Sequence, residues 1–496
     1  MNHTTEIDRT RLEQRNDRPA LQGRFVLYWM QQSQRAELNH ALEYAVQRAN
    51  AVRLPLLTLF VVAADYPEAN ARHYAFMLEG LAETSEAIEK RGVQFAMRIG
   101  SPVEEVLDVG KDAALIVCDR GYTRVQKEWR REVAGGARCQ VMQVESDVIV
   151  PLHVVSGKAE YAARTIRPKI LRHLDDYLVT LRPTPVVLQT PMLKVARTVD
   201  PFDPVSLLAS LEVDRSVLPV TRFFRGGASQ AKRRLKQFIS SELAGYKEDR
   251  NGPETNHLSH MSMYLHFGQI SPIAVALAVQ EAKRDVSAVT TGRRVGTKRG
   301  SQNSLFAARD VSADDRSTYL DELIVRRELA QNFIEFTPDY DRYTALPNWA
   351  RSTLAEHCSD DRPVLYTKSQ LERSATDDPY WNASMDEMRA TGYMHNYMRM
   401  YWGKKILEWS KTPERAFATT LELNNRYFLD GRGGNAFANV GWIFGLHDRP
   451  WFEREIFGKV RYMSAQGLER KSDIGAYVRK VNSLVDEARD ALSERS

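Results

Sequence analysis

The sequence predicts an α/β domain with a Rossmann-like parallel sheet, followed by an all-α domain. Apolar runs of strand length alternate with helical segments as far as residue 145. Prolines then punctuate residues 181–222, and from residue 223 onward the pattern is helical almost throughout. Because 496 residues are too many for one compact core, this division into domains is the expected organisation.

Five apolar runs in the N-terminal part have the length of buried strands, and helical segments separate them. The predicted strands are residues 25–29, 54–62, 93–99, 114–118 and 141–145, and the predicted helices are residues 34–50, 71–91, 103–110 and 125–134. Near-continuous apolar strands that alternate with helices are typical of a parallel sheet covered on both faces. No Gly-x-Gly-x-x-Gly follows the first strand, so a dinucleotide fingerprint is absent. The carboxyl edge of such a sheet is nonetheless where small ligands bind.

The remaining segments give the domain boundaries. Residues 1–22 are polar and charged, which predicts a flexible tail. The α/β domain is expected over residues 23–180, an inter-domain linker over 181–222, and the helical domain over 223–496. Within the helical domain, residues 283–315 are basic and poor in apolar side chains, which predicts a flexible surface insertion.

Composition excludes several classes of protein. The chain is 43% hydrophobic and 27% charged, and no apolar run approaches the ~18 residues of a membrane span. Cys118, Cys139 and Cys358 are odd in number and lack metal-ligand spacing, which favours a reducing cytosol without disulfides. The net charge of +5 permits a polyanionic partner. We therefore expect a cytoplasmic, prokaryotic protein with no membrane partner.

Five of the eight tryptophans lie between residues 381 and 451. Trp402 and Trp409 are seven residues apart in a helical segment, which places both rings on one face, roughly 10 Å apart along the axis. Trp381 precedes that helix. Because tryptophan is large and easily oxidised, such a row is either a packed core stripe or a path for single electrons.

Seven sequence blocks, in this order and spacing, carry a resemblance to a known superfamily. They are Tyr28–Arg35, Glu160–Pro168, Tyr264–Ser271, Glu322–Leu329, Asp378–Ser384, Arg399–Trp409 and Gly458–Met463. The chain resembles the photolyase/cryptochrome superfamily, and most closely the class II cyclobutane pyrimidine dimer photolyases. The likeness covers nearly the whole chain from residue 24 onward.

The resemblance implies light-driven DNA repair. In the family, fully reduced FAD absorbs blue light and passes one electron to a pyrimidine dimer that is turned out of UV-damaged double-stranded DNA. The cyclobutane ring splits and the electron returns. Some relatives also carry a deazaflavin antenna in the N-terminal domain, for which this sequence offers no decisive residue. We expect a monomer that associates with the nucleoid when bound to DNA.

The resemblance also implies which residues hold the FAD. In the family a Tyr and a loop with two Ser residues bind the flavin phosphates, and hydroxyls with successive backbone N–H groups suit a pyrophosphate. A plain helix cap with a serine pair is the alternative. Asn424 matches the residue that faces flavin N5, and its amide can accept from a protonated N5 or donate to an unprotonated one. For Asn424 the alternative is a helix C-cap. The matching Tyr and loop are Tyr246 and Leu258, Ser259, His260, Met261 and Ser262.

Arg399 and Asp430 match the buried ion pair beside the flavin ring, where a fixed positive charge stabilises an anionic reduced flavin. Arg432 follows in the same motif, but here Gly433-Gly434 replaces the Asp-Pro of relatives. Two glycines predict a more flexible loop. Asp430 is therefore a better candidate for a flavin contact than Arg432 or Asn435.

The three tryptophans match the family's electron path. By resemblance Trp402 is nearest the flavin, Trp381 is intermediate and Trp409 is nearest solvent. Electrons moving inward along this path would reduce an oxidised flavin, whereas the repair step would not need them. A packed aromatic stripe is the alternative.

Four residues match the lesion pocket of the family. Glu322 matches an acid that hydrogen-bonds the carbonyl edge of the dimer, and Met400 and Trp442 match residues that line the pocket. Arg326 stands where some relatives have a second stacking Trp, and its guanidinium plane suits both a base and a phosphate. For Glu322 the alternative is a helix ion pair with Arg326 at i+4.

Basic residues on the helical domain are candidates for phosphate contacts, with affinity that falls in salt. They are Arg250, Arg327, Lys404, Lys405, Arg461, Arg470 and Lys471. No metal is expected, because His257, His260 and His266 lack the spacing of a structural zinc site.

Three functions compete. The first is dimer repair with reduced FAD and blue light. The second is a cryptochrome-like photoreceptor that uses the same flavin and tryptophans without repair, and Glu322, Met400 and Trp442 favour repair over it. The third is a flavin oxidoreductase or a plain DNA-binding protein. The missing nicotinamide fingerprint disfavours the oxidoreductase, and a plain DNA-binding protein leaves the Trp spacing unexplained.

Overall fold

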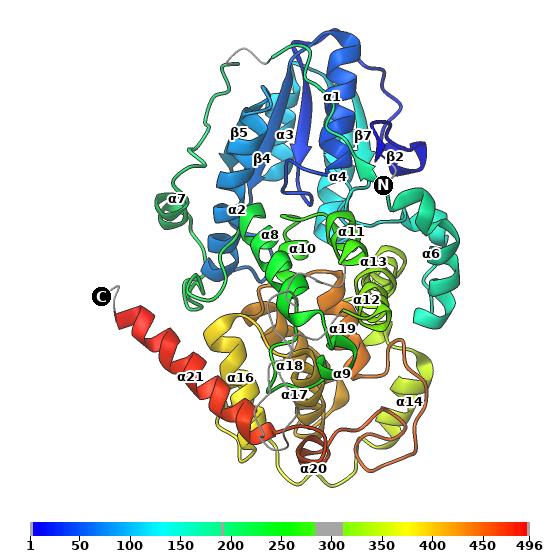
Figure 1. Cartoon of the computed structure of the whole chain (residues 1–496), viewed down its shortest axis with the longest axis vertical. Coiled ribbons are helices and arrows are strands. Elements are labelled where there is room, and N and C mark those ends of the chain that lie inside the picture. Colours follow the sequence, from blue (N-terminus) through cyan, green and yellow to red (C-terminus); the bar gives the residue numbers. More distant parts are fainter. Residues whose placement is uncertain (1–2, 190–192, 283–310, 494–496) are drawn as a thin grey trace, which may run out of the picture.

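A six-stranded sheet forms the centre of the N-terminal domain in the computed structural model, which describes residues 3–189, 193–282 and 311–493 (Figure 1). The strand order is β2-β7-β6-β3-β4-β5, and every pair is parallel except β2 with β7. This confirms the five predicted strands and their parallel sheet. The bounds are β2 Leu12–Gln14, β3 Phe25–Met30, β4 Leu56–Val62, β5 Gln94–Ile99, β6 Ala113–Asp119 and β7 Gln140–Val144.

Helices cover both faces of this sheet, as the apolar strands predicted. Helices α1 and α2 pack on the face to which Tyr28 belongs, and α3 and α4 pack on the face to which Trp29 belongs. The first helix begins six residues later than predicted, because the side chain of Asn39 accepts a hydrogen bond from the Leu42 amide and caps it there (3.1 Å). The bounds are α1 His40–Val52, α2 Ala71–Glu89, α3 Pro102–Gly110 and α4 Arg124–Gly136.

The prediction of a flexible tail over residues 1–22 was wrong for the part that the structure describes. β1 (His3–Thr4) pairs with β8 (Thr180–Leu181), and β2 forms an edge of the main sheet. Arg11 is buried, and its guanidinium donates to three carbonyls, those of Glu145, Val148 and Ile149. The order of this segment could not be predicted from the sequence, because backbone pairing and one buried arginine produce no apolar periodicity.

Helices joined by loops make up the described C-terminal part, and Figure 1 shows it below the sheet domain with α21 along one side. Two π-helical turns, Phe238–Glu242 and Asp321–Arg326, interrupt it. The main helices are α8 Ala228–Gln237, α9 Tyr246–Asp249, α10 Ser262–His266, α11 Pro272–Glu281, α12 Ala313–Leu320, α13 Arg327–Phe336, α14 Asn348–Glu356, α15 Lys368–Glu372, α16 Pro379–Thr391, α17 Asn396–Glu408, α18 Pro413–Tyr427, α19 Gly434–Ile443, α20 Ala465–Glu469 and α21 Ile474–Ser493.

Two predicted connecting segments differ from expectation in part. Most of the predicted insertion, residues 283–310, lies outside the described residues, but its last part is helical because Ser312 forms a capping box at the start of α12. The linker also contains a short helix, α7 (Pro204–Ser210). Before α7, Val199 donates its amide to the Met97 carbonyl on β5, at the edge of the sheet (2.9 Å). The connector therefore packs against the domain it leaves.

Buried guanidinium groups hold the two domains together. Arg35 donates to Gly268 (3.0 Å) in the helical domain and to Ser146 (2.9 Å) in its own. Arg72 on α2 donates to four carbonyls, which lie in the linker and at the ends of α16 and α18. They belong to Leu218, Met388, Arg389 and Tyr427. Since a guanidinium has five donors in a rigid fork, one side chain fixes three segments.

Candidate active site

The buried ion pair predicted from the sequence is present at the centre of the helical domain. Arg399 on α17 and Asp430, just after α18, form a bidentate pair with N···O distances of 3.1 and 3.2 Å. Burial opposes ionisation of Asp430, but Arg399 and Ser262 hold its pKa below the usual value. The guanidinium also lies over the ring of Phe428, 3.9 Å from its centroid. The result is a positive charge that is fixed in place and shielded from water.

The loop Leu258–Ser262 runs beside this pair and is held by a residue that the sequence reading missed. Arg234 on α8 donates to the carbonyls of Leu258 and Ser259 while its other face pairs with Glu242. His260 adopts a left-handed backbone conformation (φ 51°), which turns the loop toward α10. The sequence shows Arg234 eight positions before Glu242, but no local pattern indicates that it contacts a loop that begins 24 residues later.

Tyr246 is buried, and its hydroxyl donates to Glu322 (2.6 Å). Arg250 donates to the other carboxylate oxygen of Glu322. The structure therefore joins a predicted flavin contact, a predicted lesion contact and a predicted phosphate contact in one cluster. The alternative pairing of Glu322 with Arg326 at i+4 is wrong, because Arg326 is exposed and lies 3.5 Å from Asp321 instead.

Several buried polar atoms around Arg399 have no hydrogen-bond partner in the described part of the chain. They include Nδ1 of His260, Nε2 of His395 and Nε1 of Trp402. Burial lowers the pKa of His395 to about 3, so this ring is neutral. Its Nδ1 accepts from the Tyr397 amide (3.1 Å), which leaves the proton on Nε2 as a free donor. Unpaired groups of this kind need a polar ligand, and FAD, with ring carbonyls and nitrogens, fits them.

The three tryptophans lie in one buried cluster. The rings of Trp381 and Trp409 are 5.5 Å apart at an angle of 68°. The indole N–H of Trp381 donates to the Trp402 carbonyl (2.9 Å). Exposed fractions are 1% for Trp402, 0% for Trp381 and 5% for Trp409, and Trp402 is one turn from Arg399 on the same helix. The contacts suit both a core stripe and an electron path.

Met400 and Trp442 are both half-buried, on α17 and α19. Arg461 stacks between two rings, 5.8 Å from Trp442 and 4.4 Å from Trp451, and pairs with Asp448. Trp451 and the neighbouring Phe452, 90% exposed, were not among the predicted site residues. The sequence could have indicated them, because two adjacent aromatic residues between a proline and charged residues are typical of an exposed loop that binds a partner.

Two of the predicted phosphate contacts were wrong. Lys404 is fully buried, donates to the Ile443 carbonyl at the end of α19, and has its pKa lowered to about 7 by burial. Arg327 is 5% exposed and pairs with Asp147 of the sheet domain (2.9 Å). Lys405 lies over Trp409 and pairs with Glu408, whereas Arg470 and Lys471 are exposed. Counting charges could not show which helix face turns inward.

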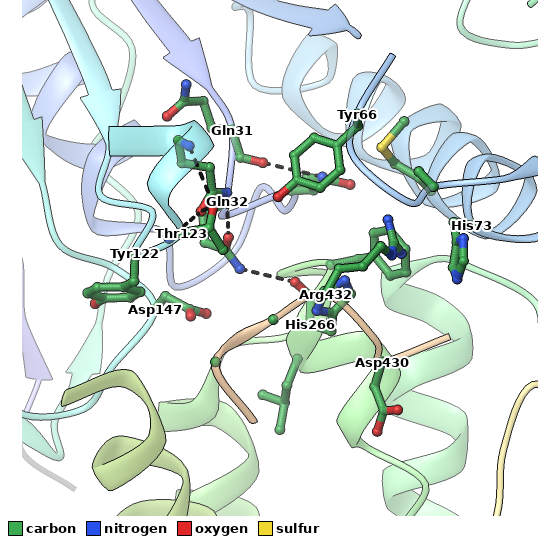
Figure 2. Close-up of a pocket in the computed structure, with 18 of the residues that line it drawn as sticks. Gln31, Gln32, Tyr66, His73, Tyr122, Thr123, Asp147, His266, Asp430 and Arg432 are labelled. Atoms are coloured by element: carbon green, nitrogen blue, oxygen red, sulfur yellow. Dashed lines mark hydrogen bonds between the residues drawn. The ribbon is translucent and has the colours of Figure 1, made fainter. Parts of the chain in front are cut away.

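A cavity lies between the domains at the carboxyl ends of β3, β4 and β6 (Figure 2). Aromatic walls and unpaired polar groups line it: both amide atoms of Gln31 and the Nε and Nη2 atoms of Arg432 have no partner among the described residues. Arg432 lies 5.9 Å from the Tyr66 ring centroid, and Figure 2 shows it beside His266. Arg432 therefore faces the sheet domain, although the sequence placed it with the flavin contacts. The lining includes Trp29, Gln31, Gln32, Tyr66, Tyr122, Trp129, Ser262, His266, Asp430, Arg432 and Asn435.

The glycines after Arg432 do not form the flexible loop that the sequence predicted. Gly433 caps α19 and Gly434 is its first residue. A Cβ on Gly433 would lie 2.7 Å from Nδ1 of His266, and one on Gly434 would lie 2.6 Å from Oε1 of Gln331. The glycines thus permit close packing of a helix start against α10 and α13.

Within the described ranges no cluster of three or more His, Cys, Asp or Glu side chains is arranged to hold a metal. No helix in those ranges is long and apolar enough to cross a membrane.

Proteins of one known family are similar to this chain over most of its length. A family model described as DNA photolyase matches residues 26–189. The deoxyribodipyrimidine photo-lyase of Methanothermobacter thermautotrophicus is 43% identical, over 95% of this chain and 97% of that protein. That of Potorous tridactylus is 36% identical, over 93% and 82%.

Solved structures show the same fold. A class III photolyase from Agrobacterium tumefaciens superposes with a TM-score of 0.69 at 19% identity and covers 93% of this chain and 87% of that one. A cryptochrome from Synechocystis superposes with a TM-score of 0.65 at 17% identity, over 92% and 88%.

Proposed function

This chain belongs to the DNA photolyase family, and on that premise we propose that it is a class II enzyme that splits cyclobutane pyrimidine dimers with light. It is a deoxyribodipyrimidine photo-lyase and acts in DNA repair. One observation carries the finer proposal. A buried bidentate pair, Arg399–Asp430, lies beside unpaired polar atoms and a tryptophan cluster, where the resemblance expects the flavin ring.

When bound, FAD supplies the absorption of light and the electron that opens the cyclobutane ring. The chain's own residues prepare the site for this. Arg399 keeps a positive charge in a shielded place and Asp430 fixes its plane, so a negative charge beside them is stabilised. The apolar residues around the tryptophans keep water away, which strengthens that effect.

Glu322 would bind the lesion. Its carboxylate is kept in place by the Tyr246 hydroxyl and by Arg250, so it is oriented before any substrate arrives. The carboxylate would then accept charge-assisted hydrogen bonds from the ring N–H groups that lie between the dimer's carbonyls, and these bonds would hold the dimer against the flavin. Arg461, Arg470 and Lys471 are the remaining candidates for contacts with DNA phosphates.

Changing Glu322 to Gln tests the lesion contact. The amide keeps the shape, but it carries no charge and one of its two acceptor atoms becomes an NH₂ donor, so the charge-assisted bonds are lost. We expect the repair rate of chemically reduced enzyme to fall about tenfold or more, the effect of losing ~1.4–3 kcal/mol. The exposed Glu356→Gln serves as the control. Repair at the wild-type rate by Glu322→Gln would remove Glu322 from the lesion site.

The cavity in Figure 2 is the candidate site for an antenna chromophore. Aromatic walls suit a planar heterocycle, and the amide of Gln31 offers a donor beside an acceptor, as a deazaflavin-type ring edge requires. A photolyase of Sulfolobus tokodaii with this fold was described with two FAD molecules and a proposed light-harvesting role. We therefore favour a deazaflavin or flavin in this cavity.

Gln31→Leu tests the antenna proposal. The variant loses both polar contacts but keeps the volume, so the dissociation constant of added deazaflavin should rise about tenfold, the cost of two unmade hydrogen bonds. Fluorescence quenching measures it. Exposed Gln14→Leu is the control. Equal affinity in wild type and Gln31→Leu would place the chromophore elsewhere, and no binding by wild type would show that the cavity holds no antenna.

A further inference from the structure

Asn425 is completely buried beside the proposed N5 contact Asn424, and three segments meet at its side chain. Its Oδ1 accepts from the backbone amide of Arg432 (3.0 Å) and from Nδ2 of Asn424 (3.0 Å). Its Nδ2 donates to Oε2 of Glu68 (2.6 Å). The mechanism above leaves this cluster without a role.

The partners of Asn425 determine which way its amide points. A backbone N–H can only donate, and an ionised carboxylate can only accept. With Arg432 N–H on one side and Glu68 on the other, the oxygen and nitrogen of Asn425 cannot exchange places. The oxygen of Asn425 must therefore face Asn424.

The orientation of the Asn425 amide determines the orientation of the Asn424 amide. Because Asn425 presents an oxygen, Asn424 must turn its NH₂ group toward it. The carbonyl oxygen of Asn424 then points away from Asn425, and within the described part of the chain it has no hydrogen-bond donor. The amide of Asn424 is thus left with an acceptor to offer to a ligand.

We propose that Glu68 and Asn425 are positioning residues that lock Asn424 with its carbonyl oxygen toward the flavin, so that it accepts a hydrogen bond from a protonated N5. This inference rests on the proposed function, because it requires a flavin at Asn424. It selects one of the two hydrogen bonds that the sequence left open for this amide. A protonated N5 belongs to the reduced flavin, so the lock favours the form that the enzyme needs.

Glu68, the first residue in this row of hydrogen bonds, belongs to the sheet domain. Glu68 is in the loop between β4 and α2 and has a left-handed backbone conformation (φ 59°). The same loop contains Tyr66, which lines the cavity in Figure 2. Asn70 of the same loop donates to the Arg426 carbonyl on α18 (2.7 Å). The loop is thereby docked on the helix that carries Asn424, and the sheet domain contributes to the flavin site through it.

The test compares flavin-loaded Glu68→Gln and Asn425→Ala with wild type. Glutamine can donate as well as accept, so Glu68→Gln weakens one of the two contacts that fix the orientation of Asn425 and leaves the other, the Arg432 N–H, in place. Glu422→Gln is the matched control, because Glu422 is exposed on the same helix two residues before Asn424. The readouts are flavin retention after gel filtration and the reduction equilibrium of the bound flavin against a reference dye.

We expect both variants to retain flavin, with the reduction equilibrium shifted at least threefold toward the oxidised form and Glu422→Gln unchanged. Because Asn425 is buried and its variant is at risk of misfolding, Glu68→Gln at the exposed end of the cluster tests the contribution of Glu68 separately. Wild-type equilibrium in a folded, flavin-bound Glu68→Gln would overturn the inference while leaving the proposed function intact. Absence of flavin from wild type, even after reconstitution, would overturn both.

Discussion

Arg399→Met should leave the protein folded but unable to retain FAD. The substitution removes the positive charge beside the flavin ring and leaves Asp430 buried without its partner. Removing one partner of a desolvated charged contact costs about 3 kcal/mol of binding free energy, which corresponds to a loss of flavin affinity of about a hundredfold. The measurement is the ratio of flavin to protein absorbance after gel filtration, with circular dichroism to check folding.

Two further variants separate the effect of the charge from that of the bidentate geometry and control for the loss of an arginine. Arg399→Lys keeps the charge but not the bidentate geometry, so it should retain an intermediate amount of flavin. Arg389→Met, on α16, removes an exposed arginine with only a 3.6 Å contact to Asp386 and should behave as wild type. If Arg399→Met kept its full complement of flavin, the ion pair would be structural only.

Trp381→Phe should slow photoreduction strongly while leaving repair intact. Trp381 lies between the other two tryptophans, in ring contact with Trp409 and hydrogen-bonded to the Trp402 backbone. Phenylalanine fills most of the space but is much harder to oxidise, so we expect the rate of photoreduction to fall about tenfold or more, a barrier increase of at least ~1.4 kcal/mol. After chemical reduction, the repair rate should equal that of wild type.

A tryptophan outside the path controls for general damage. Trp349 on α14 packs at the edge of the same cluster and donates to the Tyr161 hydroxyl (3.1 Å). It is not one of the three tryptophans assigned to the path, so Trp349→Phe should photoreduce normally. Equal loss of repair by Trp381→Phe with and without chemical reduction would show a core stripe and no electron path.

The sheet domain was predictable because its signal is local. Apolar runs such as Leu56–Val62 must be buried on both faces, and their alternation with helices dictates a parallel sheet. The antiparallel edge strand β2 was not, because Leu12–Gln14 is short and half-exposed and pairs through its backbone. The start of α1 was missed for a similar reason, since a single cap residue, Asn39, overrides the helical pattern before it.

At the site, residue identity was easier to predict than residue environment. Arg399 and Asp430 were paired correctly from the resemblance, and the structure supplies their bidentate geometry. The burial of individual side chains could not be predicted from the resemblance. Lys404 and Lys405 are neighbours with the same charge, yet one caps a buried helix end and the other lies over a tryptophan. The role of Glu68 could not be predicted either, because its partner Asn425 is 357 residues away in the chain.

The most direct test of the account is a repair assay on the purified protein. The flavin is reduced, UV-irradiated oligothymidine is added, and the absorbance at about 260 nm, which returns as the pyrimidine double bonds re-form, is followed in blue light and in darkness. The account predicts recovery in the light only, from protein with a flavin spectrum. A protein that binds and photoreduces flavin but restores no absorbance would contradict dimer repair and would favour a photoreceptor.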